Sequence, residues 1–127
     1  MAKSDYLEKR VLDHFLRVAS AAQPTALYVA LYTTATTDAG GGTEVTGGSY
    51  ARQSATFAAA TSGAGATSNS ASINFPNMPS ATVTHVAIWD ALTAGNLLYH
   101  GPLTAPQVVP AGNTFTFAIG ELDITES

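Results

Sequence analysis

After Pro24 the chain alternates short apolar segments with turns rich in glycine, proline and asparagine, and this alternation constrains the fold more than any other feature. Short segments bounded by such turns are typical of strands, and turns about every 8 to 12 residues are typical of β-sandwiches and barrels. Strands are predicted at residues 25–33, 50–58, 71–75, 82–90, 97–103 and 114–119, and again after Gly120. We therefore predict a mainly β fold, a single β-sandwich or small barrel of about six to eight antiparallel strands.

Local patterns refine this prediction at four places. Residues 25–33 are apolar on both alternating faces, which predicts a central strand. Residues 82–90 and 97–103 flank a short glycine-containing turn and are predicted to form a hairpin. At Gly120 the apolar positions shift from odd to even numbers, which indicates either a β-bulge or the end of a strand. Residues 58–70 are small and polar and are predicted to be a loop.

The N-terminal segment carries a helical pattern. Apolar residues recur three or four positions apart on one face, at Leu7, Val11, Phe15, Val18 and Ala22. We predict an amphipathic helix over residues 4–22, capped by Asp5 or its rival Ser4 and ended by Pro24. We expect it to pack on the sheet, with docking on a partner protein as the alternative. The chain is predicted to be a single domain over residues 1–127, with the β domain at residues 25–126.

Charge is scarce and unevenly placed. Charged residues make up 11% of the chain, against about 25% in typical domains. Four of the five basic residues, Lys3, Lys9, Arg10 and Arg17, precede residue 18. The β domain therefore offers no basic face, and we expect neither nucleic acid nor a membrane as a partner. A surface this poor in charge predicts cover by other copies of the chain, as a homo-oligomer, or by a larger protein.

The sequence also excludes several function classes. The absence of cysteine excludes disulfides and thiolate chemistry, and the charged N-terminus, with no apolar stretch, predicts synthesis and folding in a cytoplasm. His14, His85 and His100 are dispersed and are expected to be ordinary, partly buried histidines. A metal held by His85 and His100 across the hairpin, together with a carboxylate, is the alternative. No G-x-S-x-G turn is present, and the carboxylates available for glycoside cleavage are few. We expect neither an enzyme nor a cofactor.

The long loop at residues 34–50 is the candidate functional segment. Its glycines lack the lysine and following helix of a phosphate loop, and its acids Asp38 and Glu44 would repel an anion. A calcium site is one alternative for these acids, and a flat interface with a neighbour is the favoured interpretation. Arg52 is expected to pair with Glu44 or Asp38 within the chain, or across a subunit boundary. The candidate interface residues are Lys9, Arg10, Arg17, Asp38, Gly40, Gly41, Gly42, Glu44 and Arg52.

Longer motifs carry a family resemblance. The acidic glycine loop that runs from Asp38 to Tyr50-Ala51-Arg52-Gln53 is the most specific, and residues 4–8, 12–14, 27–33, 83–90 and 95–99 also contribute. Over most of its length the chain resembles a family of small virion proteins of tailed bacteriophages, labelled head decoration or tail fibre proteins. The resemblance implies a non-enzymatic structural role in the virion, with no catalytic residues to transfer.

The position in the virion is predicted from what the sequence lacks. Fibre shafts show repeats, and this chain has none. We therefore predict a head decoration or cement protein that stabilises the particle through contacts with itself and with a major capsid protein. A tail fibre, collar or other tail component that contacts tail proteins during host adsorption is the first alternative. A carbohydrate-binding module is the second.

Overall fold

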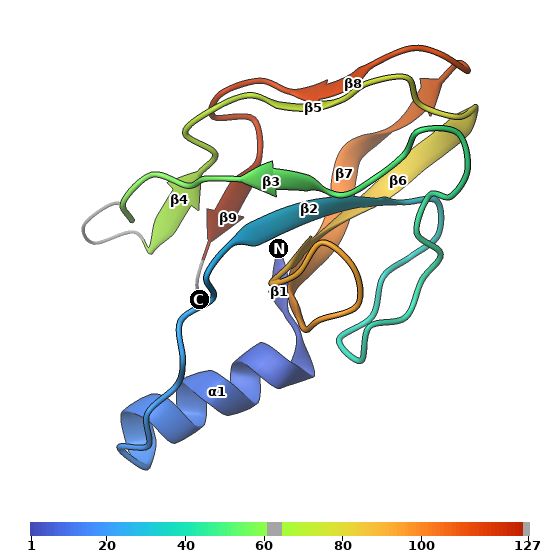
Figure 1. The fold of residues 1–127 in the computed structure, drawn as a ribbon. Helices are drawn as coiled ribbons and strands as arrows, with labels where there is room; N and C mark the ends of the chain where they lie inside the picture. Colours follow the sequence, from blue (N-terminus) through green and yellow to red (C-terminus); the bar gives the residue numbers. More distant parts are fainter. Residues whose placement is uncertain (61–64, 126–127) are drawn as a thin grey trace.

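The computed structural model describes residues 1–60 and 65–125, and it is mainly β, as predicted (Figure 1). The described elements are β1 (Ala2–Lys3), α1 (Asp5–Leu16), β2 (Leu27–Tyr32), β3 (Gln53–Ala55), β4 (Ala66–Ser68), β5 (Ile73–Phe75), β6 (Ala81–Trp89), β7 (Leu97–Val109), β8 (Phe115–Phe117) and β9 (Asp123–Thr125). The strands β1 and β4 were not predicted. β4 lies in the segment predicted to be a loop, of which residues 61–64 fall outside the described residues.

The strands form one large sheet and two small ribbons. The large sheet is antiparallel with the order β1-β7-β6-β2-β3, and the ribbons pair β4 with β9 and β5 with β8. The predicted hairpin of β6 and β7 is confirmed, with Ala87 opposite His100. The main core lies between the large sheet and the ribbons and includes Leu31, Ile88, Phe75 and Phe117. The strands do not close into a barrel, so the sandwich alternative fits the fold.

The central strand β2 is buried on both faces, as its sequence predicts. Val29 and Leu31 point into the main core, because alternate residues of a strand share a face. Ala30 and Tyr32 point the other way, into a second cluster that also contains Ala87, Leu97 and Trp89. The fold therefore needs something to cover this second face of the sheet.

A large irregularity in β7 distorts the sheet opposite β6. Val83 faces Gln107 and His85 faces Pro102, so Thr84 alone lies opposite residues 103–106. β1 pairs with β7 at Tyr99 and His100, and in the described part of the chain no other strand borders the outer edge of β7. β7 contains Pro102 and Pro106, which have no N–H to donate to a further strand.

The shift of apolar phase at Gly120 marks a strand end rather than a bulge. β8 ends at Phe117, and Gly120 has a φ of 82° in a turn closed by a 3.0 Å hydrogen bond from the N–H of Glu121 to the carbonyl of Ala118. Ile119, predicted to lie in the strand, is exposed. Leu122 and Ile124 then re-enter the core, on the way into and within β9.

The helix is shorter than predicted. Ser4 rather than Asp5 is the N-cap, since its hydroxyl accepts from the N–H of Leu7 at 3.2 Å. α1 ends at Leu16, so the prediction of helix for residues 17–22 is wrong. Val18 takes a φ of 56°, and the N–H of Ala19 donates to the carbonyl of Asp13 at 3.0 Å. The chain reverses there, well before Pro24, because the last helical turn supplies acceptors to the segment that follows it.

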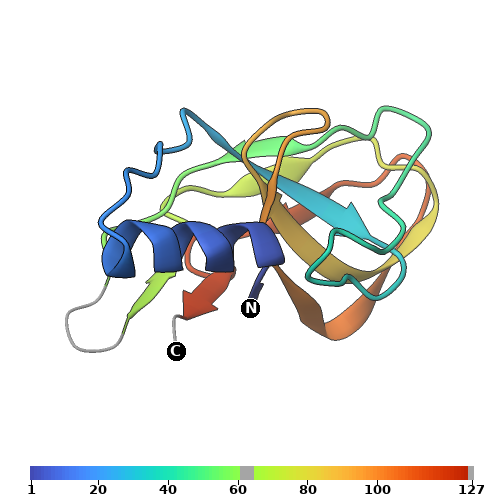
Figure 2. The same cartoon turned by 90° about the horizontal axis from the view of Figure 1, so that it is seen from below.

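The helix lies beside the β domain without being buried by it. α1 runs along one side of the molecule in Figures 1 and 2 and is tied to β7 by a 2.9 Å bond from the N–H of Ser4 to the carbonyl of Leu98. Leu7 and Val11 are half-buried, whereas Phe15 and Leu16 are exposed, and no residue of α1 is buried. The expectation that the apolar face packs on the sheet is therefore wrong for its outer half.

Two phenylalanines test this division between core and surface. Phe75 is 1% exposed and Phe15 is 71% exposed. Replacing Phe75 with Ala should lower the free energy of unfolding by about 3 to 5 kcal/mol, because it leaves a cavity in the core. The matched variant Phe15→Ala should change it by less than about 0.5 kcal/mol. Urea unfolding measures both, and a large loss in Phe15→Ala would show that the helix stabilises the monomer.

Candidate functional site

The loop at residues 34–50 pairs with the end of β2, where Glu44 lies opposite Tyr32 in an antiparallel bridge. The N–H of Thr33 donates to the carbonyl of Thr43 at 2.9 Å, and the N–H of Val45 donates to the carbonyl of Leu31 at 2.9 Å. Gly42 has a φ of 104°, and a Cβ there would lie 3.2 Å from the ring of Tyr32, so a side chain would not fit. The loop, predicted to lie flat against a neighbour, thus lies on its own sheet.

Arg52 anchors this loop within the chain. Its Nη2 lies 3.0 Å from Oε1 of Glu44, and its Nε lies 3.1 Å from Oε2, which makes a bidentate ion pair. The Arg52 side chain is 9% exposed, so the charge is largely removed from water. Of the pairings considered from the sequence, the structure shows the one with Glu44 inside the chain, while Asp38 has a different partner.

Aromatic side chains complete the surroundings of the ion pair. The guanidinium carbon of Arg52 lies 4.2 Å from the ring centre of Trp89, a cation–π contact, and Nη1 donates to the carbonyls of Ala91 and Ala94. The hydroxyl of Tyr50 donates to Glu44 at 2.8 Å and accepts from the N–H of Leu31 at 3.0 Å. We call these residues the Arg52 cluster: Leu31, Glu44, Tyr50, Arg52 and Trp89.

Sequence reasoning missed Tyr50 and Trp89 as members of this cluster. The signal that could have found Tyr50 is its spacing of two from Arg52, because residues two apart in an extended segment share a side. No comparable spacing links Trp89 to Arg52.

Asp38 holds the first half of the loop through a histidine. Nε2 of His100 lies 2.6 Å from Oδ1 of Asp38, and its Nδ1 lies 2.7 Å from Oγ1 of Thr36. His85 does not join this group, since its Nδ1 lies 2.9 Å from Oγ1 of Thr84. Asp38 and Glu44 thus have separate partners. Among residues 1–60 and 65–125, no group of three or more His, Asp or Glu side chains is placed to hold a metal, so the calcium alternative gains no support.

The remaining candidate residues lie on α1 or at the loop surface. Lys9 and Arg17 each form an ion pair with Asp13, which lies four residues away along the exposed face of the helix. The hydrogen bond from Lys9, aided by both positive charges, lowers the pKa of Asp13. The guanidinium of Arg10 lies 6.0 Å from the ring centre of Tyr6. Gly40 and Gly41 lie in a turn that Thr37 closes. The carbonyl of Thr37 accepts from the N–H of Gly40, and its hydroxyl accepts from the N–H of Gly41.

The end of α1 carries the most conspicuous surface feature. Five of the eight exposed large hydrophobic residues in the described part of the chain fall between residues 6 and 18. Four of them form what we call the helix tip: Leu12 (55% exposed), Phe15 (71%), Leu16 (76%) and Val18 (88%). Lys9 and Arg17, also exposed, flank this group. Clustered exposure of this kind marks an interaction surface, whereas scattered exposure does not.

Comparison with known proteins places the chain in a family. A family model described as the podophage GP4 fiber I protein gp80 (Gp80) matches residues 2–125. The chain belongs to this family. Membership of the Gp80 family confirms the resemblance to phage virion proteins labelled tail fibre, and it indicates a fibre-type structural protein of the virion. A search of curated proteins finds no match. Within the described residues, no helix combines the length and apolar character that crossing a membrane requires.

The bidentate geometry of the Arg52 cluster predicts that a positive charge without the guanidinium shape will not hold the loop as tightly. Arg52→Lys keeps the charge but loses one of the two bonds to Glu44 and the planar contact with Trp89. We expect a loss of about 1 to 3 kcal/mol in the free energy of unfolding, measured with urea. Arg17→Lys, on the exposed helix, is the matched control and should change little. Equal behaviour of the two variants would contradict the anchoring role of Arg52.

The buried tyrosines predict a loss of stability at alkaline pH. Burial raises the pKa of Tyr50 well above its ordinary value, with a further contribution from Glu44, and burial also raises the pKa of Tyr32. Below the unfolded-state pKa of about 10, both states keep these protons and stability is unaffected. Above it, the unfolded state loses protons that the folded state retains, so stability falls as pH rises.

A spectrophotometric titration measures this effect. The two tyrosines whose pKa is raised, Tyr32 and Tyr50, should ionise only as the protein unfolds, in step with the loss of circular dichroism. Tyr32→Phe is the control and should remove one of these late-ionising groups. Ionisation of all five tyrosines while the fold stays intact would contradict the prediction.

Proposed function

We propose that this protein is a subunit of a bacteriophage fibre, made in the cytoplasm of the bacterial host and incorporated into the virion. It acts through contacts with further copies of itself and with other virion proteins. The observation that carries the proposal is the helix tip, a set of large apolar side chains exposed on an element that the β domain does not bury. Membership of the Gp80 family supports the interpretation that this surface contacts other proteins of a phage fibre.

Burial energetics support assembly rather than a solitary subunit. Full burial of a side chain such as Leu or Phe contributes roughly 1.5 to 3 kcal/mol, and the helix tip leaves this contribution unused. A partner that covers Leu12, Phe15 and Leu16 would recover it. The Phe15→Ala variant separates this role from folding, since the fold has little need of the ring.

Fibre and head decoration remain the two positions to distinguish. The absence of repeats favoured decoration of the head, whereas the description of the family model favours a fibre. A short chain without repeats still builds a fibre when copies associate, because the repeat then lies in the assembly rather than in the sequence. We therefore prefer the fibre and keep the capsid-stabilising role as the alternative that the experiment below tests.

The polar clusters support a structural role rather than catalysis. Thr36, His100 and Asp38 follow the order nucleophile, base and carboxylate, but His100 is 6% exposed and both of its ring nitrogens hold the loop in place. Sugar-binding sites commonly present an exposed aromatic ring, and Trp89 is covered by Arg52. We accordingly propose a non-enzymatic protein that needs no cofactor and binds neither nucleic acid nor membrane.

Copy number in purified virions tests the position. Quantitative mass spectrometry should find on the order of ten copies per particle, as fibres attached around a tail of low symmetry require. Deletion of the gene should leave intact heads and reduce host adsorption. On the order of a hundred copies, with heads that become less heat-stable after deletion, would instead show head decoration. Its absence from the virion would contradict both.

A further inference from the structure

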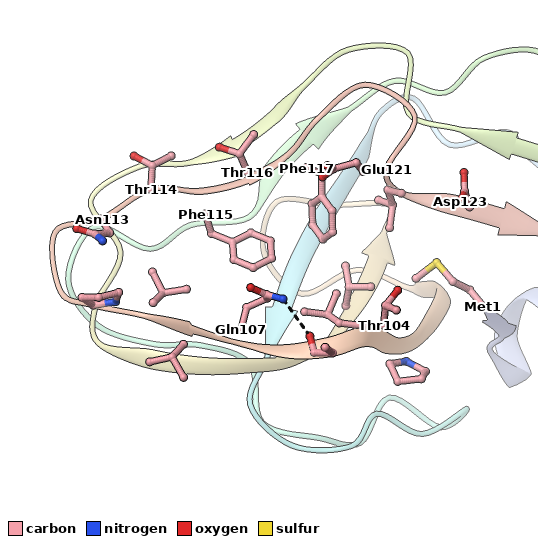
Figure 3. A pocket seen from close by; sticks show the side chains of 18 residues that line it. Met1, Thr104, Gln107, Asn113, Thr114, Phe115, Thr116, Phe117, Glu121 and Asp123 are labelled. Atoms are coloured by element: carbon pink, nitrogen blue, oxygen red, sulfur yellow. Dashed lines mark hydrogen bonds between the residues drawn. The ribbon is translucent and has the colours of Figure 1, made fainter.

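A groove of about 670 Å³ opens between β7 and the segment that contains β8 and β9 (Figure 3). Figure 3 shows the rings of Phe115 and Phe117 directed from β8 towards β7, where they form the apolar floor together with Leu103 and Leu122. The irregularity at residues 103–106 and the open edge of β7 border the groove, and its floor is part of the core, since Phe115 is 9% and Phe117 7% exposed.

The rim of the groove is polar and carries negative charge. Its uncharged polar residues are Thr104, Gln107, Asn113, Thr114 and Thr116. Glu121 and Asp123 are its only charged side chains, and no basic side chain lines it within the described residues. Both acids are exposed. An occupant that combines apolar side chains with positive charge would match both the floor and the rim.

The edge of β7 disfavours one common kind of occupant. An added β-strand would need donors along this edge, and Pro102 and Pro106 provide none. The groove is therefore better suited to side chains inserted from a helix than to a strand that extends the sheet.

We propose that the helix tip of one copy docks into the β7–β8 groove of a second copy. Phe15 and Leu16 would enter the groove beside the exposed side chain of Val108, and Lys9 and Arg17 would face Glu121 and Asp123 at the rim. The inference deepens the proposed function and rests on it, because it specifies how fibre subunits meet.

Charge complementarity is the argument for this occupant. Residues 9–17 hold three basic side chains, Lys9, Arg10 and Arg17, and one acidic side chain, Asp13, whereas the groove has two negative side chains. The acids Asp5 and Glu8 belong to the first helical turn and precede this segment. The contact therefore brings opposite charges together, which favours the correct orientation of the two copies.

The two surfaces lie on different parts of the same molecule. Met1 lines one end of the groove, and α1 leads away from that end while β7 runs in the other direction (Figures 1 and 2). The helix tip thus points away from the groove of its own chain. A contact between two unlike surfaces is head-to-tail, and it builds a closed ring or an extended row of subunits.

A mixing experiment tests this head-to-tail contact. The helix variant Phe15→Asp/Leu16→Asp keeps an intact groove, and the groove variant Glu121→Lys/Asp123→Lys keeps an intact helix tip. In sedimentation velocity the wild-type protein should associate, and each variant alone should associate at least about tenfold more weakly. An equal mixture should form a heterodimer that grows no further, because only one helix tip and one groove remain intact.

Two controls keep the test interpretable. Ile119→Asp changes an exposed apolar residue outside both surfaces and should associate like the wild type. Circular dichroism should show that each variant folds. A single variant that carries Lys9→Glu, Arg17→Glu, Glu121→Lys and Asp123→Lys swaps the charges of the two surfaces. It should recover part of the association that the groove variant loses.

Other outcomes would overturn the inference. They are a wild-type protein that stays monomeric, variants that associate as the wild type does, or a mixture of folded variants that stays monomeric. The copy number in virions is measured independently. A failed mixture with a fibre-like copy number would reject this contact and leave the proposed function in place, whereas absence from the virion would reject the proposed function itself.

Discussion

The ion pair between Arg52 and Glu44 fixes the long loop of residues 34–50 to the β domain. β2 is apolar on both faces, and the loop of residues 34–50 approaches its second face at Gly42, where a Cβ would lie 3.2 Å from the ring of Tyr32. The pair fastens that loop, with Trp89 on the flat side of the guanidinium and Tyr50 bonded to the carboxylate. A chain with few charged residues thus uses its one basic side chain outside the N-terminal segment to hold a long loop on a sheet.

The loop and α1 differ in whether their side chains find partners inside the chain. The Asp38 to Glu44 segment, predicted to be an interface, satisfies its polar groups inside the chain through His100 and Arg52. The helix, predicted to belong to the core, leaves its outer apolar residues uncovered. The exposed apolar end of the helix supports the alternative that the helix docks on a partner, and the interface predicted at the glycine-rich loop stays a prediction.

The sequence was sufficient for those features that depend on local periodicity. Alternation placed Val29 and Leu31 in the core, and the turn at residues 93–96 placed the hairpin of β6 and β7. Prediction from the sequence failed where contacts between residues distant in the chain determine the local structure. The helix ends early because Asp13 and His14 accept hydrogen bonds from the following segment, and Asp38 meets His100 through the tertiary fold. The strand β4 forms in a stretch of small residues because β9 pairs with it, and no local sequence pattern predicts this pairing.

The prolines of β7 have a consequence for the host cell that produces the protein. An open sheet edge at high concentration is a template for uncontrolled stacking into amyloid-like aggregates. Pro102 and Pro106 interrupt the row of donors on that edge without closing the groove beside it. An edge interrupted in this way is a poorer template for insoluble deposits than an edge with an unbroken row of donors.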